Sequence, residues 1–301
     1  MNLFCFGLGY SAEHTIRDFG ARFDRVAGTV READKAAHIA RAGIGGRNVE
    51  AVVFDGTSAP PDIAPLLSEA DCILMSAPPN QDGDPVLRQY ADTLARAARP
   101  QSIVYLSTVG VYGDNAGVWV DEATPAVPRT ERSRARRAAE QAWAELAARS
   151  RKSLAILRLS GIYGPGRNAL LQVANGTARR IVKPGQVFNR IHVADIAQAI
   201  AAAFAARHDG IVNVADDEPT PPGEPIAFAA HLLGVAPPPE IPFAEAAPNM
   251  SPMALSFYGE SRRVRNARLK GGLGVALKYP SYREGLTALF AAGDHRGATA
   301  R

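Results

Sequence analysis

Two glycines and an alanine near the amino terminus have a spacing that suits phosphate chemistry. Gly7, Gly9 and Ala12 form a G-x-G-x-x-A pattern between an apolar run at 2–6 and a helix-compatible segment at 13–19. Gly7 permits a sharp turn, the missing Cβ of Gly9 leaves room for a pyrophosphate, and a small residue at position 12 lets helix and strand pack closely. The pattern by itself is also compatible with an ordinary strand-to-helix turn, but its place between a strand and a helix favours a dinucleotide site.

Backbone N–H groups at the start of the following helix have no acceptor inside that helix. They point at the space before it, and the positive end of the helix dipole adds to their attraction for phosphate. We therefore expect Tyr10 and Ser11, together with the three small residues of the pattern, to border the cofactor.

The end of the second predicted strand separates the two nicotinamide dinucleotides. A carboxylate there suits the ribose 2′-hydroxyl of NAD, whereas an arginine suits the 2′-phosphate of NADP. The strand ends in Gly28-Thr29-Val30-Arg31, which favours NADP over NAD, with Arg31 on the phosphate. Asp55, after the third strand, is placed to accept a hydrogen bond from the adenine amine, and Ala77 and Pro78, after the fourth, are expected beside the cofactor.

These residues need a scaffold of alternating strands and helices, which the rest of the chain provides. Strands are predicted at 2–6, 25–31, 49–54, 72–75, 102–106, 154–159 and 211–214, and the main helices at 13–19, 32–42, 64–69, 85–98 and 195–206. The strands are almost continuously apolar, as expected for a parallel sheet covered on both faces. Right-handed crossovers make this a doubly wound α/β sheet with ligands at the carboxyl ends of its strands.

Composition divides the chain after the sixth strand. We assign 1–159 to a Rossmann-like dinucleotide-binding domain, 160–293 to the remaining sheet elements and a small substrate-side cap, and 294–301 to a frayed tail. The cap prediction rests on ten prolines between 218 and 252, which allow short helices and strands only.

The totals exclude several classes of protein. A chain of 301 residues with 47% hydrophobic and 21% charged residues can bury a large core, but no apolar run reaches the roughly 18 residues of a membrane helix. Cys5 and Cys72 lie in apolar strands without ligand-spaced companions, so we expect core residues and no metal site. The net charge of +4 comes from clustered arginines without interleaved aromatic residues, which argues against nucleic-acid binding. A strand that begins at Asn2 leaves no room for a leader, so a cytoplasmic protein is expected.

Four further segments occur in an order that carries a resemblance. They follow the glycine turn in the chain. The four segments are Ser107-Thr108-Val-Gly-Val-Tyr112-Gly113, Leu157 to Arg167, Arg190-Ile-His192-Val-Ala-Asp195, and a closing region that contains 261–266 and 279–285. The ordered set resembles the extended short-chain dehydrogenase/reductase superfamily, the NAD-dependent epimerase/dehydratase group, over nearly the whole chain. The resemblance implies hydride transfer with an acid/base Tyr, a Lys four residues later that lowers its pKa and holds the nicotinamide ribose, and a Ser or Thr on the reacting oxygen. Thr108 stands at the position of that hydroxyl.

The Tyr and Lys of the family pattern are missing. Alignment on Glu140 places Arg132 at the Tyr position and Arg136 at the Lys position, and no tyrosine occurs between Tyr112 and Tyr163. An arginine is a poor proton donor near neutral pH because its pKa lies above about 12. The chain therefore resembles an atypical branch of the superfamily without Tyr-x-x-x-Lys.

Three interpretations of this gap stay open. The first is an oxidoreductase that uses another acid, for which Tyr112, Tyr163 and His192 are the candidates, although each also fits a structural role. The second is a non-catalytic protein that binds NADP(H) and reports its redox state to a partner. In the third, Arg132 and Arg136 bind the anion of a phosphorylated or nucleotide-linked substrate.

We expect an NAD(P)-dependent oxidoreductase or epimerase-like protein that acts on a carbonyl or nucleotide-sugar-like substrate. The rigid Gly164-Pro165-Gly166 loop would bring a substrate phosphate close to Arg167, with His192 a further substrate candidate. Asp195 is expected in the first turn of a helix, where a carboxylate complements the dipole. A homodimer is compatible with the sequence.

Overall fold

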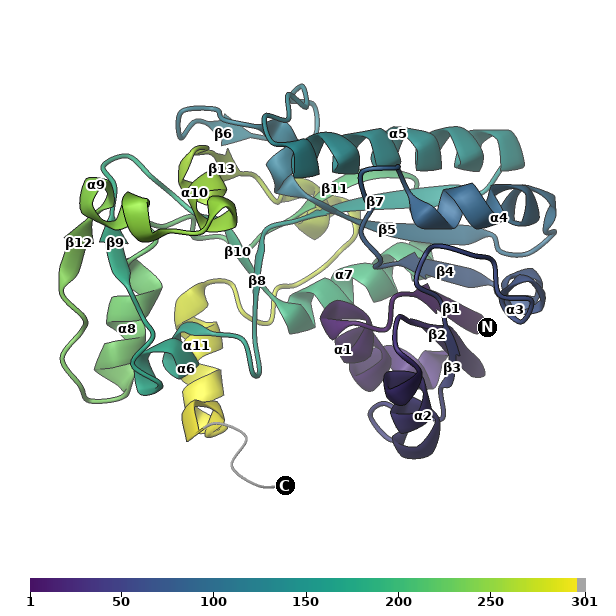
Figure 1. The fold of residues 1–301 in the computed structure, drawn as a ribbon, viewed down its shortest axis with the longest axis horizontal. Helices are drawn as coiled ribbons and strands as arrows, with labels where there is room; N and C mark the ends of the chain where they lie inside the picture. The colour runs from purple at the N-terminus through teal and green to yellow at the C-terminus, as the bar shows by residue number, and fades with distance from the viewer. Residues whose placement is uncertain (297–301) are drawn as a thin grey trace.

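A seven-stranded, fully parallel sheet forms the centre of the molecule (Figure 1). The structure, a computed structural model, describes residues 1–296. The sheet consists of β1 (Asn2–Phe6), β2 (Arg25–Val30), β3 (Glu50–Val53), β4 (Cys72–Met75), β5 (Ser102–Thr108), β7 (Ser153–Leu159) and β11 (Gly210–Val214). All seven were expected from the sequence, and the doubly wound α/β fold is confirmed.

The strand order is β11-β7-β5-β4-β1-β2-β3, so the direction in which the chain adds successive strands reverses beside β1. Leu3 pairs with Val26 of β2 on one side and with Cys72 of β4 on the other. The chain thus leaves β1 towards one edge of the sheet and returns across it to build the other edge. In open parallel sheets such a reversal, at the carboxyl ends of the strands, is where ligands bind.

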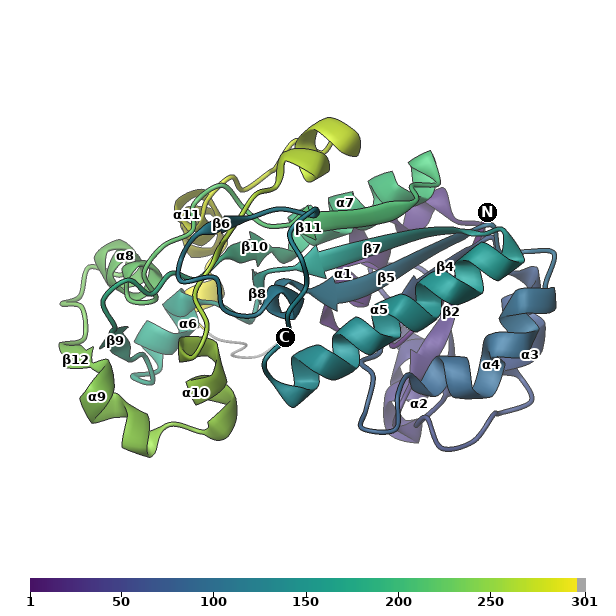
Figure 2. The same ribbon diagram turned by 90° about the horizontal axis from the view of Figure 1, so that it is seen from above.

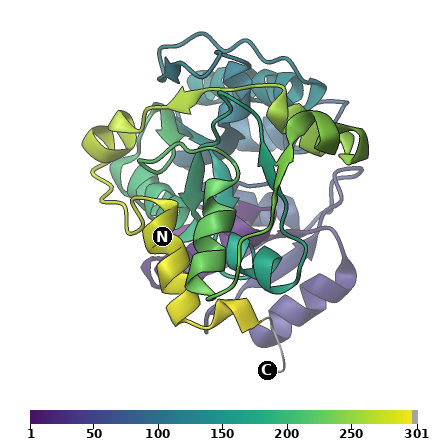
Figure 3. The ribbon, with the colours of Figure 1, turned by 90° about the vertical axis from the view of Figure 1, so that its left-hand side faces the viewer.

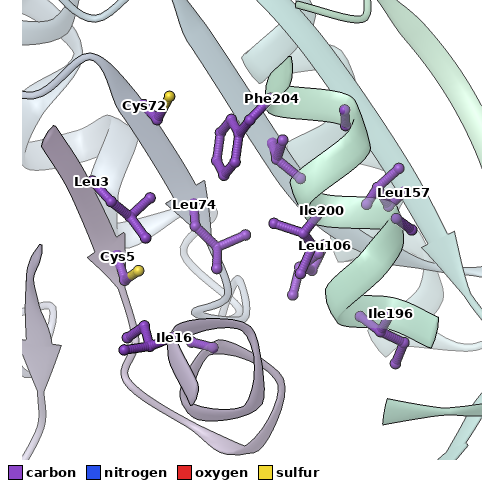
Figure 4. Packing of buried hydrophobic residues seen from close by; sticks show 14 of the residues in the cluster. Leu3, Cys5, Ile16, Cys72, Leu74, Leu106, Leu157, Ile196, Ile200 and Phe204 are labelled. Carbon is purple, nitrogen blue, oxygen red and sulfur yellow. The ribbon is translucent and has the colours of Figure 1, made fainter. Parts of the chain in front are cut away.

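Alternate side chains of the strands enter two separate cores, one on each face of the sheet. On the first face Leu3, Cys5 and Leu157 pack against α1 (Tyr10–Phe19), α2 (Ala33–Ala42) and α7 (Val193–Ala206), as Figure 4 shows in part. On the second face Phe4 and Phe6 pack against α3 (Ile63–Glu69), α4 (Pro85–Arg96) and α5 (Glu131–Ser150). Burial on both faces explains why these strands lack the alternating polar pattern of an exposed sheet.

Local signals fix the ends of the helices near the carboxyl edge. Thr130 caps α5 because its Oγ1 accepts the Ser133 N–H at 3.1 Å, and Asp84 caps α4 in front of Pro85. Gly43 ends α2 with a φ of +67°, as a C-cap glycine can. In Figure 2, α5 runs along the length of β5 and β7, so its first turn lies at the end of the sheet where those strands finish.

The remaining elements form a cap beyond that edge (Figure 3). It contains the short helices α6 (Ala169–Ala174), α8 (Glu224–Leu232), α9 (Phe243–Ala246), α10 (Pro252–Tyr258) and α11 (Tyr282–Ala291). Three two-stranded pairs join distant segments, namely β8 (Gly161–Tyr163) with β10 (Arg190–His192), β9 (Arg180–Val182) with β12 (Glu240–Pro242), and β6 (Trp119–Val120) with β13 (Arg263–Val264). Single turns occur at η1 (Gly20–Arg22), η2 (Val109–Tyr112), η3 (Ala247–Asn249), η4 (Arg268–Gly272) and η5 (Asp294–Arg296).

The structure differs from the sequence-based expectation at both ends of the chain. Helix α1 begins at Tyr10 rather than Glu13, because Gly9 already serves as its N-cap. Residues 294–296, which were assigned to a frayed tail, form η5, and the Asp294 carboxylate accepts the Gly166 N–H at 3.1 Å. The rest of the predicted tail, 297–301, lies outside the described residues.

Two expectations about whole-chain properties can be compared with the structure. Cys5 and Cys72 are free and buried in adjacent strands, as expected for core residues. None of the helices within residues 1–296 has the length and apolar character needed to cross a bilayer.

Candidate functional site

The glycine turn closes tightly between β1 and α1. Gly7 has a φ of +90°, and its N–H donates to Thr29 Oγ1 of β2 at 2.9 Å. The next N–H, that of Leu8, donates to the Thr29 carbonyl oxygen at 2.7 Å. A Cβ at Gly7 would lie 3.0 Å from the Ala77 nitrogen, so glycine is required here for both conformation and space.

The space in front of α1 is open. A Cβ built on Gly9 meets no heavy atom within 4 Å. The first hydrogen bond within α1 runs from the Glu13 N–H to the Gly9 carbonyl at 2.8 Å, so the N–H groups of Tyr10, Ser11 and Ala12 precede it and have no acceptor in the helix. The turn therefore presents open space, unused donors and a helix dipole at one point, which fits a bound pyrophosphate.

The residues that the sequence predicts at the adenosine end of the cofactor are solvent-exposed. Arg31 follows the last residue of β2 and is exposed. The Asp55 carboxylate accepts the Thr57 N–H at 2.8 Å and the Thr57 hydroxyl at 2.7 Å, and these hydrogen bonds hold its pKa below the usual value. Asp55 thus belongs to a tight turn after β3, and one of its oxygens takes both bonds.

Lys35 is a cation at the turn that the sequence analysis missed. Its Nζ donates to the Leu8 carbonyl at 2.8 Å and pairs with the Glu13 carboxylate at 2.7 Å. Lys35 lies in the first turn of α2, whereas Arg31 precedes that helix, so no helical spacing in the sequence linked Lys35 to the predicted site.

The loop after β4 borders the same turn. The N–H groups of Ser76 and Ala77 both donate to the Phe6 carbonyl at 2.9 Å, which fixes the loop against the end of β1. Pro78 follows and is exposed. Ala77 therefore lies against Gly7, and Pro78 faces solvent beside it, so both stay candidates for the cofactor contact that the sequence predicts.

Thr108 is the last residue of β5 and caps the turn η2. Its Oγ1 accepts the Gly110 N–H at 3.1 Å, and the residue is half-buried. Because β5 is separated from β1 only by β4, Thr108 and the glycine turn lie at the same edge of the sheet.

The two arginines at the Tyr and Lys positions behave differently. Arg136 Nη1 donates to the Leu106 carbonyl at 2.9 Å and to the Tyr105 hydroxyl at 3.2 Å, and its guanidinium carbon lies 5.6 Å from the centre of the Tyr105 ring. Arg132, one turn earlier in α5, is exposed. Arg136 is thus fixed against the end of β5, two residues from Thr108, whereas Arg132 faces solvent.

A buried ion pair that the sequence analysis did not foresee supports this corner. The Glu140 carboxylate has no exposed surface and accepts hydrogen bonds from Arg158 at 3.0 and 2.8 Å, from Ser107 at 2.6 Å and from Arg137 at 3.0 Å. It connects α5, β5 and β7 directly beneath Thr108. In the sequence Glu140 lies next to the apolar Ala139 but also within one turn of Arg136 and Arg137, so its burial gave no signal.

The three alternative acids named from the sequence are all buried and all hydrogen-bonded. The Tyr112 hydroxyl donates to Asn213 Oδ1 at 2.8 Å, and the Tyr163 hydroxyl donates to the Ser281 carbonyl at 3.2 Å. Burial raises the pKa of both tyrosines.

His192 lies between the rings of Tyr163 and Tyr279. Its Nδ1 accepts the Ala194 N–H at 3.1 Å, and burial, helped by His14 and Lys278, lowers its pKa to about 4. It is therefore neutral at physiological pH, with a proton on Nε2, an atom that has no partner among the described residues.

The loop of Arg167 contacts the glycine turn directly. The Tyr10 hydroxyl donates to the Pro165 carbonyl at 2.9 Å, and Gly164 and Arg167 exchange two backbone hydrogen bonds of 3.0 Å. Arg167 itself is exposed. The structure thus brings the cofactor turn and the expected substrate loop together through Tyr10.

Asp195 lies in the first turn of α7, as expected, and its carboxylate also accepts hydrogen bonds from the segment before α11. Its carboxylate accepts the N–H groups of Lys278 at 2.6 Å and Tyr279 at 3.1 Å, and the side chain of Gln198 at 2.7 Å. It therefore ties α7 to the segment that leads into α11.

The parallel sheet, its reversal beside β1 and the glycine turn at that reversal define the Rossmann-like α/β class. Residues 88–215 match the model of the NAD-dependent epimerase/dehydratase family. The match confirms, over these residues, the resemblance to that family inferred from the ordered motifs.

Three similar proteins show how closely the chain follows its relatives. A functionally unknown conserved protein from Silicibacter pomeroyi has 44% identity, with 97% of this chain and 99% of that one covered and a TM-score of 0.85. A 3-diazoavenalumate denitrifying reductase from Streptomyces has 29% identity over 66% of this chain, and the match spans 64% of that protein's length. The human epimerase family protein SDR39U1, solved with NADPH, has 20% identity, with 96% of this chain and 98% of that one covered and a TM-score of 0.71. At this low identity the likeness shows a shared fold alone.

Proposed function

We propose that this protein is an NADP(H)-dependent oxidoreductase that reduces a carbonyl or a similarly electron-poor group. The observation that carries the proposal is the open space over Gly9 at the start of α1, with three backbone N–H groups free of intrahelical acceptors. A bound nicotinamide nucleotide would supply the hydride. Gly7, Gly9, Tyr10, Ser11 and Ala12 would hold its pyrophosphate.

The preference for NADP over NAD rests on charge. Arg31 is exposed at the end of β2, and Lys35 reaches the glycine turn from the next helix. Lys35 is already paired with Glu13, so the positive charge that favours a 2′-phosphate is that of Arg31.

The reacting oxygen would be hydrogen-bonded by Thr108 at the end of β5. Arg136 lies beside that strand end, because hydrogen bonds to the Leu106 carbonyl and the Tyr105 hydroxyl fix the position of its guanidinium. A fixed cation stabilises the negative charge that develops on an oxygen during hydride transfer. The name of the Streptomyces relative, a denitrifying reductase, supports reduction rather than epimerisation.

Arg132 and Arg167 are the residues we assign to the outer part of the substrate. Both are exposed, and Arg167 lies in the loop that Tyr10 contacts. Guanidinium groups bind carboxylate and phosphate well, so an anionic small molecule, phosphorylated or nucleotide-linked, suits them. A carbonyl or nucleotide-sugar-like compound remains the substrate class of the proposal.

A non-catalytic NADP(H) sensor is the second candidate. Its supporting observation is that arginines occupy both the Tyr and the Lys positions of the family pattern, and that Tyr112 and Tyr163 already donate to Asn213 and Ser281. Such a protein would bind the cofactor with the same glycine turn but would not consume it.

Two measurements on the full chain separate these functions. Calorimetry with NADPH and NADH tests the cofactor assignment, and absorbance of the reduced nicotinamide during incubation with carbonyl compounds and sugar nucleotides tests turnover. Turnover that Thr108→Ala abolishes, and that the exposed-helix control Thr287→Ala keeps, supports the oxidoreductase. Cofactor binding without oxidation across the panel supports the sensor, and no binding of either nucleotide contradicts both.

The homodimer and the cytoplasmic location stay parts of the proposal. Sedimentation of the full chain tests the first, because a dimer has twice the monomer mass of 31.9 kDa. Localisation of a tagged chain by cell fractionation tests the second.

A further inference from the structure

Gly110 separates two side-chain hydroxyls at the carboxyl end of β5. A Cβ built on Gly110 would lie 3.3 Å from Thr108 Oγ1 and 3.2 Å from Ser133 Oγ. The two oxygens come from different elements, β5 and the first turn of α5, and converge on the space that the missing methyl leaves. Gly110 has an ordinary backbone conformation, so only this space, and not its φ, favours glycine.

Both hydroxyls keep a proton to donate. Thr108 Oγ1 accepts the Gly110 N–H at 3.1 Å, and Ser133 Oγ accepts the Thr130 hydroxyl at 2.8 Å. Within residues 1–296 neither hydroxyl donates to a protein acceptor. Ser133 is buried while Thr130 is only half-buried, so the pair Thr130–Ser133 leads from the interior towards solvent.

The N-cap of α5 directs Ser133 into this corner. Thr130 accepts the Ser133 N–H, which fixes the first turn of the helix and points position 133 inward, in line with Arg136 and Glu140. Arg132, at the family's Tyr position, is consequently exposed. The side chain of α5 that approaches Thr108 is therefore Ser133, one residue after Arg132, which occupies the position of the family's tyrosine.

We propose that Ser133 is a catalytic residue that, together with Thr108, hydrogen-bonds the reacting oxygen of the substrate in place of the missing tyrosine. This inference rests on the proposed oxidoreductase function. It names the proton donor that the sequence leaves open, and it excludes the buried, fully engaged tyrosines 112 and 163 from that role.

The proposed step balances without a further reactant. The carbonyl carbon accepts hydride from the reduced nicotinamide, the C–O π bond breaks, and its electron pair stays on oxygen. That oxygen takes the proton of Ser133, Ser133 regains one from the Thr130 hydroxyl, and Thr130 regains one from water. A serine hydroxyl is a weak acid, so Arg136 at the end of β5 stabilises the alkoxide until the relay completes.

An activated ketone and its alcohol serve as probes of this site. The ketone 2,2,2-trifluoroacetophenone is reduced in the presence of NADPH, and binding of 2,2,2-trifluoro-1-phenylethanol to protein saturated with NADP⁺ is followed by fluorine NMR. The variants are Ser133→Ala, which removes the hydroxyl, and Gly110→Ala, which places a methyl group between the two hydroxyls. Ser68→Ala is the matched control, because Ser68 is exposed in α3 and bonds only to Ala64 of its own helix.

Both test variants should lower kcat for the ketone by about 100-fold, as loss of one preorganised donor does. They should weaken alcohol binding at least ten-fold and leave calorimetric NADPH binding near wild type. Ser133→Ala should also keep the thermal midpoint, whereas the methyl of Gly110→Ala, 3.2 Å from Ser133 Oγ, should lower it slightly. Ser68→Ala should change none of these quantities. The binding measurement does not depend on turnover. A variant that only slows the reaction would therefore lower kcat but would not weaken alcohol binding.

Each contrary result has a distinct meaning. Ser133→Ala with wild-type kcat and wild-type alcohol affinity overturns the inference and leaves the oxidoreductase in place. Wild-type protein that binds NADPH but neither reduces the ketone nor binds the alcohol also overturns it, while the cofactor assignment stands. Protein that binds no nicotinamide nucleotide contradicts the proposed function itself.

Discussion

Glu140 and Arg158 form a bidentate ion pair with almost no exposed surface, with hydrogen bonds of 3.0 and 2.8 Å. The pair joins the middle of α5 to β7, and Ser107 adds the end of β5 through a hydrogen bond of 2.6 Å to the same carboxylate. The strand end that carries Thr108 is thus fixed by a buried charge network rather than by apolar packing alone.

Removal of one member of this pair should destabilise the fold strongly. Arg158→Met leaves Glu140 buried with fewer donors, which costs about 3–5 kcal/mol of unfolding free energy. Urea denaturation of wild type and variant measures this loss. Glu50→Gln, which removes a partner of Arg25 in an exposed pair, is the control and should cost less than about 1 kcal/mol. Equal losses for the two variants would contradict the structural role of the buried pair.

Asp216 should make stability fall as the pH rises from about 4 to about 8. Burial raises the pKa of its carboxyl to about 8, against the attraction of Arg190, while Asp217 and Glu218 lie nearby. In the unfolded chain the same group ionises near pH 4, so between these values only the folded state keeps the proton, and stability declines by up to about 1.4 kcal/mol per pH unit. The comparison is best made from pH 6.5 to 8, above the range in which His192 contributes.

Asp216→Asn removes the titratable carboxyl. The difference in pH dependence between wild type and variant therefore isolates the contribution of Asp216. Denaturation curves at pH 6.5 and 8.0 should show a smaller pH-dependent loss for the variant. Identical slopes for the two proteins would show that Asp216 is ionised in the fold.

Arg31 should determine the choice between the two nicotinamide dinucleotides. Arg31→Ala should raise the dissociation constant for NADPH at least about ten-fold, the effect of one lost charge-assisted hydrogen bond, and leave that for NADH nearly unchanged. Arg41→Ala, an exposed arginine at the other end of α2, is the control. Tighter binding of NADH than NADPH by wild type would refute the NADP assignment.

Tyr10 should couple the glycine turn to the loop of Arg167. Tyr10→Phe keeps the ring but removes the hydrogen bond to the Pro165 carbonyl, at a cost of about 0.5–1.5 kcal/mol. Hydrogen exchange of the amides at 164–168 should accelerate in the variant. Unchanged protection of that loop would argue that the contact with Asp294 fixes it without help from α1.

The sequence predicts most of the central sheet because its signals there are local. The apolar runs at Cys72–Met75 and Leu154–Leu159 are buried on both faces, and Gly7, Gly9 and Ala12 lie within a single turn of chain. The start of α1 was placed three residues late because Tyr10 and Ser11 carry no helix signal of their own.

Contacts between distant segments account for what the sequence could not predict. Trp119 pairs with Arg263 in a two-stranded sheet, although 143 residues lie between them. Ser133 and Lys35 belong to the site only because of how α5 and α2 are rotated about their axes. Alignment by spacing assigned Arg132 to the tyrosine position instead of Ser133. The two are adjacent in the sequence, but one residue of helix changes the direction of a side chain by about 100°.

The most direct test of the central claim is calorimetry of NADPH with the Gly9→Ala variant. The added Cβ meets no atom of the protein, and the φ of −110° at Gly9 suits alanine, so the thermal midpoint should stay the same or rise. If the space before α1 holds the pyrophosphate, the variant should bind NADPH at least ten-fold more weakly than wild type. A folded Gly9→Ala protein that binds NADPH as tightly as wild type would contradict the account.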